Sequence, residues 1–234
     1  MIDGILLIDK QEGITSYDVI RKLKRVFERG QKIGHAGTLD PFATGLLIVL
    51  LGRATKLMNT FHTFDKGYLV DAQLGFCTDT QDITGKVVER NESIKPSLED
   101  IEGVIKKELL GDISQTPPMY SAKKVDGKKA YEIAREGRTV ELQARDITVS
   151  KYDVVKYEYP YISCNVLCST GTYIRTLIDD LGKKLGSYAT ATTLRRVNIG
   201  DYNVKDALSS QKISTLSEEE ILKYVIDISK VRSI

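Results

Sequence analysis

One segment, GHAGTLDPFATGLLIVLLG at positions 34–52, limits what this chain can fold into more than any other. Its end, LLIVLL at positions 46–51, is a continuous apolar run of strand length, which predicts a buried strand. Ahead of that strand, glycines surround a single acid, Asp40, and Pro41 stiffens the position after it. An aspartate that caps a tight turn would fit this composition. A plain connection does not need so much constraint, however, so the segment predicts a carboxylate held in a rigid loop.

The rest of the chain predicts helices and strands that follow one another. The expected strands cover residues 4–9, 45–51, 68–74, 147–158 and 161–168, and the last two form an antiparallel pair around Pro160. The expected helices cover residues 16–28 (with Ser16 as the cap), 97–110, 129–136 and 173–185, and a last helix follows the capping box of Ser217 and Glu220. This order predicts an α+β fold, with helices flanking a mixed, largely antiparallel central sheet. No clear boundary separates two domains, so residues 1–234 are expected to form a single domain.

Several classes of function lack the residues that they need. His35 has no nucleophilic serine or cysteine arranged with it, so a hydrolase triad is poorly supported, and neither a phosphate-binding loop nor a dinucleotide-binding pattern occurs. The histidines are His35 and His62 alone, and Cys77, Cys164 and Cys168 are expected to be buried thiols, so we expect no metal site. The short apolar run at the N-terminus fits neither a signal peptide nor a membrane span, which predicts a cytoplasmic protein.

The formal net charge is only +2, so a nucleic-acid partner would require local groups of positive charge. Three such groups are Arg21, Lys22, Lys24 and Arg25; Lys123, Lys124, Lys128 and Lys129; and Lys183, Lys184, Arg195 and Arg196. Taken by itself, each group is more often a solvated face than a binding site, so the groups leave the partner open.

The segment that contains Asp40 resembles the catalytic signature of the bacterial tRNA pseudouridine-55 synthases, the TruB family. Five further blocks in the family's order extend the resemblance over about residues 4–200: GILLIDKQEGITSYDVIRKLKR, DKGYLVDAQLGFCTDTQDITGKV, TPPMYSAKKVDGKKAYEIAREG, CSTGTYIRTLIDDLGKKLG and TLRRVNIG. One block could arise by chance, whereas six in order do not. The resemblance implies the pseudouridine synthase fold with an RNA-binding cleft, and the isomerisation of a T-loop uridine in tRNA (position 55) to pseudouridine without metal or cofactor.

The resemblance also implies which residues are catalytic. Asp40 corresponds to the family's essential carboxylate, and Arg175 corresponds to the arginine that pairs with this carboxylate and keeps it ionised. The reaction breaks the bond from ribose C1′ to uracil N1, turns the base in the pocket, and rejoins it through C5. Whether Asp40 attacks the sugar, adds to the base or removes the C2′ proton stays open.

Further residues correspond to the family's substrate-binding positions. His35 corresponds to the histidine that occupies the space left by the flipped-out uridine, and Tyr68 to the tyrosine that stacks on the flipped base. The resemblance places Tyr173 and Leu194 in the lining of the base pocket, and Lys10 and Lys124 in contact with RNA phosphate. Without the resemblance, Leu194 would be read as a core residue.

The chain departs from the family at its end, because most members continue into a small C-terminal RNA-binding domain and this sequence stops at Ile234. We therefore expect weaker RNA affinity with a flatter salt dependence. The lysine-rich segment 115–145 is expected to be a basic insert that is mobile in the free protein and clamps RNA. The expected partner is tRNA, bound through its T stem-loop by a monomer that needs no protein partner.

Three other functions compete with this one. A catalytically silent RNA-binding or tRNA-folding module would not need Asp40, Tyr68 and Arg175 together. A related enzyme that acts on ribosomal or guided RNA would rely on the C-terminal domain and on protein partners. A glycoside hydrolase would need a second carboxylate in a comparable setting, and the sequence offers none.

Overall fold

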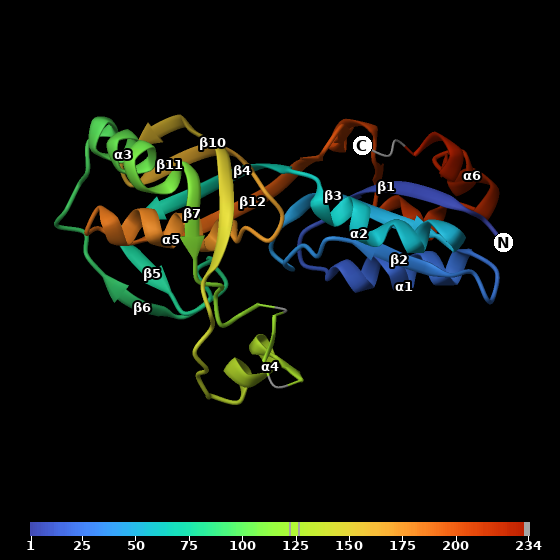
Figure 1. Cartoon of the computed structure of the whole chain (residues 1–234), viewed down its shortest axis with the longest axis horizontal. Coiled ribbons are helices and arrows are strands. Elements are labelled where there is room, and N and C mark those ends of the chain that lie inside the picture. The colour runs from blue at the N-terminus through green and yellow to red at the C-terminus, as the bar shows by residue number, and fades with distance from the viewer. Residues whose placement is uncertain (122, 126, 232–234) are drawn as a thin grey trace. The chain divides into compact units, whose positions relative to one another are not determined.

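The computed structural model describes residues 1–121, 123–125 and 127–231, without the side chains of Lys124, Lys129 and Arg135. The chain divides into two compact units, of which the first comprises Met1–Tyr68 with Leu194–Ile234 and the second comprises Leu69–Thr193. Two strands, β4 (Lys66–Leu74) and β12 (Ala189–Ile199), have residues in both units. Figure 1 labels the elements of each unit.

The first unit is built on an antiparallel pair of strands. β1 (Gly4–Lys10) pairs with β3 (Thr44–Leu51) along its whole length, from Gly4 opposite Leu51 to Lys10 opposite Gly45. β3 also pairs antiparallel with β2 (Ile33–Ala36) and parallel with β12. Three short strands complete the sheet of this unit: β13 (Tyr202–Asn203), β14 (Leu208–Ser209) and β15 (Ile226–Asp227).

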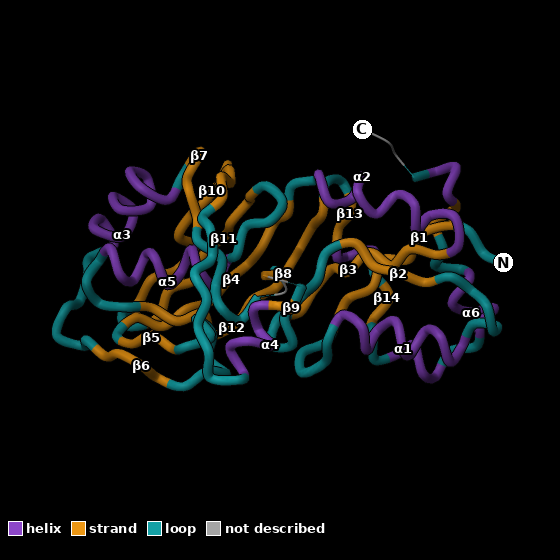
Figure 2. The backbone as a smooth tube through the Cα atoms, turned by 60° about the horizontal axis from the view of Figure 1, so that its bottom comes forward, coloured by secondary structure: helices purple, strands orange, loops and turns teal. Residues whose placement is uncertain are grey.

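Two helices cover the two faces of this sheet, as the strands and helices of Figure 2 show. α1 (Ser16–Val26) packs Val19, Ile20 and Leu23 against one face, and α2 (Met58–Thr63) brings Phe61 to the other. Side chains of β3 alternate between the two resulting clusters, so almost every position of this strand is buried. Burial on both faces explains why its sequence is a continuous apolar run without alternation.

The first unit also contains short helical turns, and its cap residues are well defined. The turns are η1 (Gly52–Leu57), η3 (Val204–Asp206), η4 (Lys212–Thr215), α6 (Glu218–Leu222) and η5 (Ile228–Lys230). Ser217 and Glu220 form the predicted capping box of α6. The prediction that Ser16 caps α1 was wrong, because Thr15 forms the capping box with Asp18 and leaves the Ser16 hydroxyl for another contact.

The second unit contains a sheet with the strand order β4, β11 (Tyr161–Cys168), β10 (Arg145–Glu158) and β7 (Gly111–Gln115). The long antiparallel pair of β10 and β11 joins at the predicted Pro160 turn. The helices are α5 (Ile174–Lys184), and α3 (Leu98–Val104), which continues into the π-helical turn η2 (Ile105–Leu109). A two-stranded ladder is formed by β5 (Phe76–Thr78) and β6 (Val87–Arg90).

A small substructure lies within the segment 115–145 of the second unit. It comprises the ladder of β8 (Lys124–Val125) and β9 (Lys128–Lys129), followed by α4 (Ala130–Arg135). Figure 1 shows α4 away from the sheet of its unit. Ala130, Ile133 and Leu142 of this segment are nevertheless buried. Its predicted mobility and its contact with RNA stay predictions.

The predicted α+β fold with a mixed, largely antiparallel sheet is confirmed, and each predicted strand is present with shifts of its ends. β2, β7 and β12 were not predicted. β12 was missed because its sequence, ATATTLRRVNI, combines small and polar residues with two arginines and shows no apolar alternation. The single-domain prediction stays a prediction. Across the described part of the chain, the structure contains no helix of sufficient length and apolar character to span a membrane.

The double-sided burial of β3 yields a prediction about stability. Leu47 is fully buried between β1 and α1, so Leu47→Ala should lower the free energy of unfolding by about 2–5 kcal/mol through lost burial and a residual cavity. Equilibrium urea denaturation followed by circular dichroism measures this change. Leu69→Ala is the matched control, because Leu69 lies on β4 with 45% of its surface exposed and should change stability by less than about 0.5 kcal/mol. Equal losses in both variants would contradict the burial assigned to β3.

Candidate active site

Asp40 lies in a loop, residues 37–43, that joins the antiparallel strands β2 and β3 (we call it the Asp40 loop). The Asp40 side chain is partly exposed, and its neighbours Leu39 and Phe42 are buried. The main-chain carbonyl of Asp40 accepts a hydrogen bond of 3.1 Å from the nitrogen of Ala43, which closes a turn inside the loop. The loop therefore presents its acid while its apolar side chains are packed.

The residue before Asp40 is attached to the start of α1. The Ser16 hydroxyl accepts a 2.8 Å hydrogen bond from the nitrogen of Leu39 and donates one of 3.2 Å to the carbonyl of Leu39. Ser16 is 2% exposed, so water does not compete for these bonds. The hydroxyl that was expected to cap the helix instead fixes the Asp40 loop.

The residue after Asp40 is attached to the end of β1. The Lys10 ammonium donates hydrogen bonds to the carbonyls of Gln11 (2.9 Å), Ile14 (2.8 Å) and Pro41 (3.3 Å), and Pro41 also accepts one of 2.9 Å from the nitrogen of Gly13. The Lys10 side chain is 0% exposed. We expected Lys10 to touch RNA phosphate, but burial and three carbonyl partners give it a different position, in which it supports the loop from inside.

The two ends of the loop are joined by a second buried cation, Arg196 of β12. Its guanidinium donates to the carbonyls of Gly37 (3.0 Å), Thr38 (3.4 Å) and Leu46 (2.8 Å), and its side chain is 2% exposed. Gly45 lets the main chains of β3 and β12 approach closely here, because it has a φ of +104° and a Cβ there would lie 2.2 Å from the Arg196 carbonyl oxygen. The sequence groups Arg196 with candidate RNA-binding cations, but the structure buries it, so it does not form part of an exposed basic group.

The neighbouring arginine of β12, Arg195, makes an ion pair with Asp9 of β1, close to Thr44 at the start of β3. Its two terminal nitrogens donate to both carboxylate oxygens of Asp9, at 3.0 and 2.7 Å. This two-bond geometry matches the planar guanidinium to the planar carboxylate. Adjacent residues of β1 thus bind different elements: Asp9 binds Arg195 of β12, and Lys10 donates to Pro41 of the Asp40 loop.

Burial and neighbouring charges lower the pKa values of Lys10 and His35, two of the predicted site residues of this unit. Burial lowers the pKa of Lys10 to about 8, the negative charge of Asp40 opposes this shift, and the positive charge of Arg196 adds to it. Burial, together with the charges of Arg196 and His62, also lowers the pKa of His35, so the imidazole is neutral at neutral pH. The buried Nδ1 of His35 has no hydrogen-bond partner among the described residues.

In the second unit, Arg175 occupies the first turn of α5 and is 3% exposed. Its guanidinium lies 3.5 Å from the carboxylate of Asp82 and donates to the carbonyls of Thr80 and Tyr120, the latter at 2.9 Å. Asp82 is itself held by the Thr80 hydroxyl (2.9 Å) and the nitrogen of Thr84 (3.0 Å). These contacts fix the orientation of the Arg175 guanidinium.

Tyr173, the residue before α5, is held through its main chain and its ring. The Gln115 amide donates to the carbonyl of Tyr173 (3.0 Å) and accepts from its nitrogen (2.8 Å). The guanidinium of Arg145 lies 4.9 Å from the centre of the Tyr173 ring and also donates to the carbonyl of Gly171. The Tyr173 ring is thus fixed although it is only half-buried.

The structure places the predicted site residues in both units. Those of the first unit are Asp40, His35, Lys10, Tyr68 and Leu194; those of the second are Tyr173, Arg175 and Lys124. Tyr68 and Leu194 are 7% and 5% exposed. The main chain of Lys124 lies in β8, and its side chain lies outside the described part of the structure. The pairing of Arg175 with Asp40 stays a prediction.

Sequence reasoning missed the residues that hold these side chains in place. They are Ser16, Arg196, Asp82, Gln115 and Arg145. Their partners are mostly main-chain atoms of residues distant in sequence, which leave no local pattern. The sequence contains a weak signal only for Ser16. Thr15 and Asp18 already satisfy the capping-box pattern, so the Ser16 hydroxyl is not needed as a cap and is available for another hydrogen bond.

No candidate metal centre accompanies these groups in the described residues, because no set of three or more His, Cys, Asp or Glu side chains is gathered there. The cysteines Cys77, Cys164 and Cys168 are buried free thiols, as predicted. Burial raises the pKa of Cys164 to about 12, so this thiol stays protonated at neutral pH.

The lowered pKa of Lys10 predicts how stability depends on pH. The folded-state value of about 8 lies below the ordinary lysine value of 10.5, so the unfolded chain binds more protons between these two pH values. Relative to Lys10→Met, which lacks the titrating group, the wild-type free energy of unfolding should therefore rise as pH increases from about 8 to about 10.5. Urea denaturation at several pH values in this range measures both proteins.

Lys56→Met is the matched control for this experiment, because it removes an exposed lysine of η1 with the same change of chemistry. The control should follow the wild-type pH profile. A constant difference between wild type and Lys10→Met across this range would contradict the buried, charge-destabilised environment assigned to Lys10.

Comparisons with known proteins agree with the fold and the signature. Residues 24–174 match the model of the TruB family pseudouridylate synthase N-terminal domain, and residues 175–227 match that of the tRNA pseudouridylate synthase B C-terminal domain. The tRNA pseudouridine synthase B of Endomicrobium trichonymphae is 46% identical over 225 residues, which cover 96% of each chain. That of Clostridium kluyveri is 43% identical over 229 residues, covering 98% of this chain and 77% of the relative.

Solved structures share the architecture. A Cbf5–Nop10–Gar1 complex contains a chain that is 25% identical with a TM-score of 0.68, and the match covers 94% of this chain and 57% of that one. An H/ACA ribonucleoprotein bound to a substrate RNA containing 2′-deoxyuridine matches at 23% identity with a TM-score of 0.66, which shows the fold alone. This chain spans 58% of the chain in that second structure. On its sequence blocks and the matched family models, the chain belongs to the TruB family of pseudouridylate synthases.

Proposed function

We propose that this protein isomerises a T-loop uridine of tRNA, at position 55, to pseudouridine, with Asp40 as the catalytic carboxylate. The observation that carries the proposal is the anchoring of the Asp40 loop. Buried donors on Ser16, Lys10 and Arg196 hold the main chain on both sides of the acid. Such fixed placement of a reacting group lowers the entropic part of a reaction barrier.

The reaction balances without an outside reagent. The C1′–N1 bond breaks, a C1′–C5 bond forms, C5 gives up its proton, and N1 takes up a proton. No electron is gained or lost overall, so neither an oxidant nor a reductant is required, and we propose that no cofactor takes part. A carboxylate can assist as a nucleophile or as a base, and these routes remain alternative forms of the proposal.

The remaining site residues bind and orient the base in this proposal. Arg175, in the first turn of α5, pairs with Asp40 in this proposal, and its guanidinium is oriented by its hydrogen bond to the Tyr120 carbonyl. His35 fills the space vacated by the flipped-out uridine; its low pKa means that a neutral ring does so. Tyr68 stacks on the base, an interaction worth about 1–3 kcal/mol, and Tyr173 and Leu194 line its pocket.

The partner and setting follow from the same proposal. The relatives from Endomicrobium trichonymphae and Clostridium kluyveri carry the name tRNA pseudouridine synthase B, which supports tRNA as the substrate. We propose that the protein acts in the cytoplasm as a monomer without an obligate protein partner. The segment 115–145, including Lys124, is proposed to clamp the RNA.

Two alternatives remain testable. A catalytically silent RNA-binding or tRNA-folding module would keep the RNA affinity and lose the chemistry. An enzyme acting on another RNA would keep the chemistry and change the modified nucleotide. The family membership, together with the anchored acid, favours an active enzyme over the first alternative.

Conversion of unmodified tRNA tests the proposal. Wild type and Asp40→Asn are incubated with the tRNA, and pseudouridine is mapped by chemical labelling. Asp40→Asn should lose activity by at least about four orders of magnitude, because the amide cannot act as a base or form the same ester. The Asp40 loop should keep its structure, since its anchors are main-chain contacts of neighbouring residues.

Asp206→Asn serves as the control, because Asp206 is an exposed aspartate of η3 with the same change of charge. It should convert the T-loop uridine at the wild-type rate. Tight tRNA binding without conversion by wild type would select the RNA-binding module, and conversion at another uridine would overturn the substrate assignment. Wild-type activity in Asp40→Asn would remove Asp40 from the mechanism.

A further inference from the structure

The exposed face of α1 carries a concentration of positive charge that the proposed chemistry does not use. The eleven residues of this helix include four cations, Arg21, Lys22, Lys24 and Arg25, and one acid, Asp18. Their net charge of +3 is larger than the +2 of the whole chain. The positive potential of this protein is therefore local, as binding to a polyanion requires in a nearly neutral chain.

Helical spacing sorts these side chains onto one face. Val19, Ile20 and Leu23 pack into the core, so the opposite side of α1 points to solvent. Tyr17, Arg21 and Lys24 follow one another at intervals of four and three residues on that side, and Arg25 lies beside them. We call Tyr17, Arg21, Lys24 and Arg25 the α1 basic face.

Tyr17 organises this face. Its ring is 55% exposed, although a tyrosine of this helix could have packed into the core. The guanidinium of Arg21 lies 5.6 Å from the ring centre and the ammonium of Lys24 lies 5.9 Å from it, within the range of cation–π attraction. The aromatic ring thus holds two cations close together, and its hydroxyl is an additional donor of the kind that contacts phosphates.

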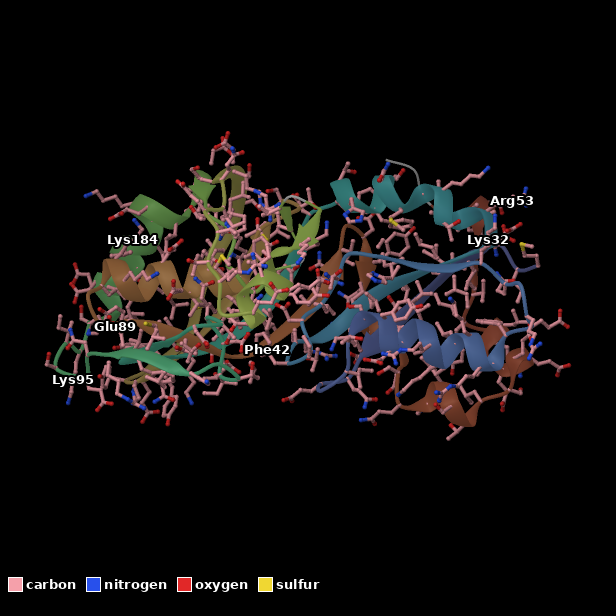
Figure 3. The ribbon with its side chains drawn as sticks, turned by 90° about the horizontal axis from the view of Figure 1, so that it is seen from below. Lys32, Phe42, Arg53, Glu89, Lys95 and Lys184 are labelled. Carbon is pink, nitrogen blue, oxygen red and sulfur yellow. The ribbon has the colours of Figure 1, made fainter. Side chains whose placement is uncertain are left out.

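The α1 basic face begins at the Asp40 loop. Tyr17 follows Ser16, whose hydroxyl bonds both main-chain groups of Leu39 beside Asp40. From there the helix extends for about 16 Å, since each residue adds about 1.5 Å. Figure 3 shows the labelled Phe42 of the Asp40 loop near one end of α1 and the labelled Lys32 toward the other. The first residue of the α1 basic face therefore lies next to a residue that holds the Asp40 loop.

Ordinary roles account for only part of the pattern. Lys24 and Arg25 lie in the last turn, where cations interact favourably with the helix dipole. Arg21 lies earlier and makes an exposed ion pair of 2.5 Å with Asp18, a type of contact worth about 0–1 kcal/mol that a phosphate can replace. Neither role explains an exposed tyrosine whose ring lies near two of the cations.

We propose that the α1 basic face binds the phosphate backbone of the RNA stem that carries the target loop. This inference rests on the proposed function, because that function brings a loop uridine to Asp40 and leaves the stem to continue away from it. Phosphate contacts supply most of the sequence-independent affinity for RNA and fix its register. Lys22 is excluded from the face, because its ammonium donates to the carbonyl of Ser210.

The test compares two triple variants of equal charge. In the first, Arg21→Ala, Lys24→Ala and Arg25→Ala remove the cations of the α1 basic face. In the matched control, Lys56→Ala, Lys205→Ala and Lys223→Ala remove three exposed lysines from other elements of the same unit. Alanine favours helices, so α1 should remain folded, which circular dichroism checks. The probe is an RNA hairpin with the T stem-loop sequence.

Dissociation constants are measured over a series of salt concentrations, and pseudouridine formation is measured at saturating hairpin. The association constant of wild type should fall steeply with salt, and in the first variant the magnitude of the slope of its logarithm against log salt should be smaller by about three. Binding by this variant at about 0.1 M salt should be weaker by roughly tenfold or more, and kcat should be unchanged. The control should keep the wild-type slope within about one contact. A loss of kcat with an unchanged slope would assign these residues to something other than phosphate binding.

The outcomes separate this inference from the proposed function. If wild type converts the uridine and the two triple variants bind alike, the α1 basic face is overturned while the function stands. If wild type binds the hairpin without converting it, the function fails, and the comparison of slopes still decides about the α1 basic face. If wild type does not bind the hairpin, the α1 basic face is overturned as well.

Discussion

The geometry of the Asp40 loop depends above all on one buried guanidinium. Arg196 joins the carbonyls of Gly37 and Thr38, at the start of the loop, to that of Leu46 beyond its end. A planar guanidinium can do this, because its three nitrogens donate from fixed and separated positions and so reach both ends of the loop. Burying such a charge is costly, and the carbonyl contacts are what make it tolerable.

The other two anchors act on the main chain as well. Ser16 bonds Leu39, and Lys10 bonds Pro41, so the residues on both sides of Asp40 are held by side chains from α1 and β1. The loop is therefore shaped by its neighbours and not by the acid that it carries. This arrangement separates the structural role of the segment from its chemical role, and it explains why so short a loop needs three buried polar side chains.

The sequence predicts some parts of this molecule much better than others. β3 and the β10–β11 pair could be identified because burial and turn residues leave regular local patterns. Asp40 could be identified from the unusual density of glycine around it, strengthened by the family resemblance. β12 could not, because its buried members include Arg196, whose partners lie about 150 residues away in the chain.

The same limit applies to individual residues of the site. The family resemblance placed Lys10 in contact with RNA phosphate, whereas the structure buries it among main-chain carbonyls, an environment that is rare for lysine. Gln115 and Asp82 were missed because they act on Tyr173 and Arg175, which are distant in sequence. Residues that hold a site residue in place are specified by tertiary packing. A single sequence therefore identifies the site residue more easily than the residues that hold it.

The two ends of the segment 115–145 contact the same residue, Tyr173. Gln115 ends β7 and bonds the main chain of Tyr173, and Arg145 begins β10 and covers the ring of the same tyrosine. Tyr173 is therefore in contact with both the first and the last residue of the segment. A rearrangement of the segment at either end would therefore break a contact of Tyr173, the residue that precedes α5.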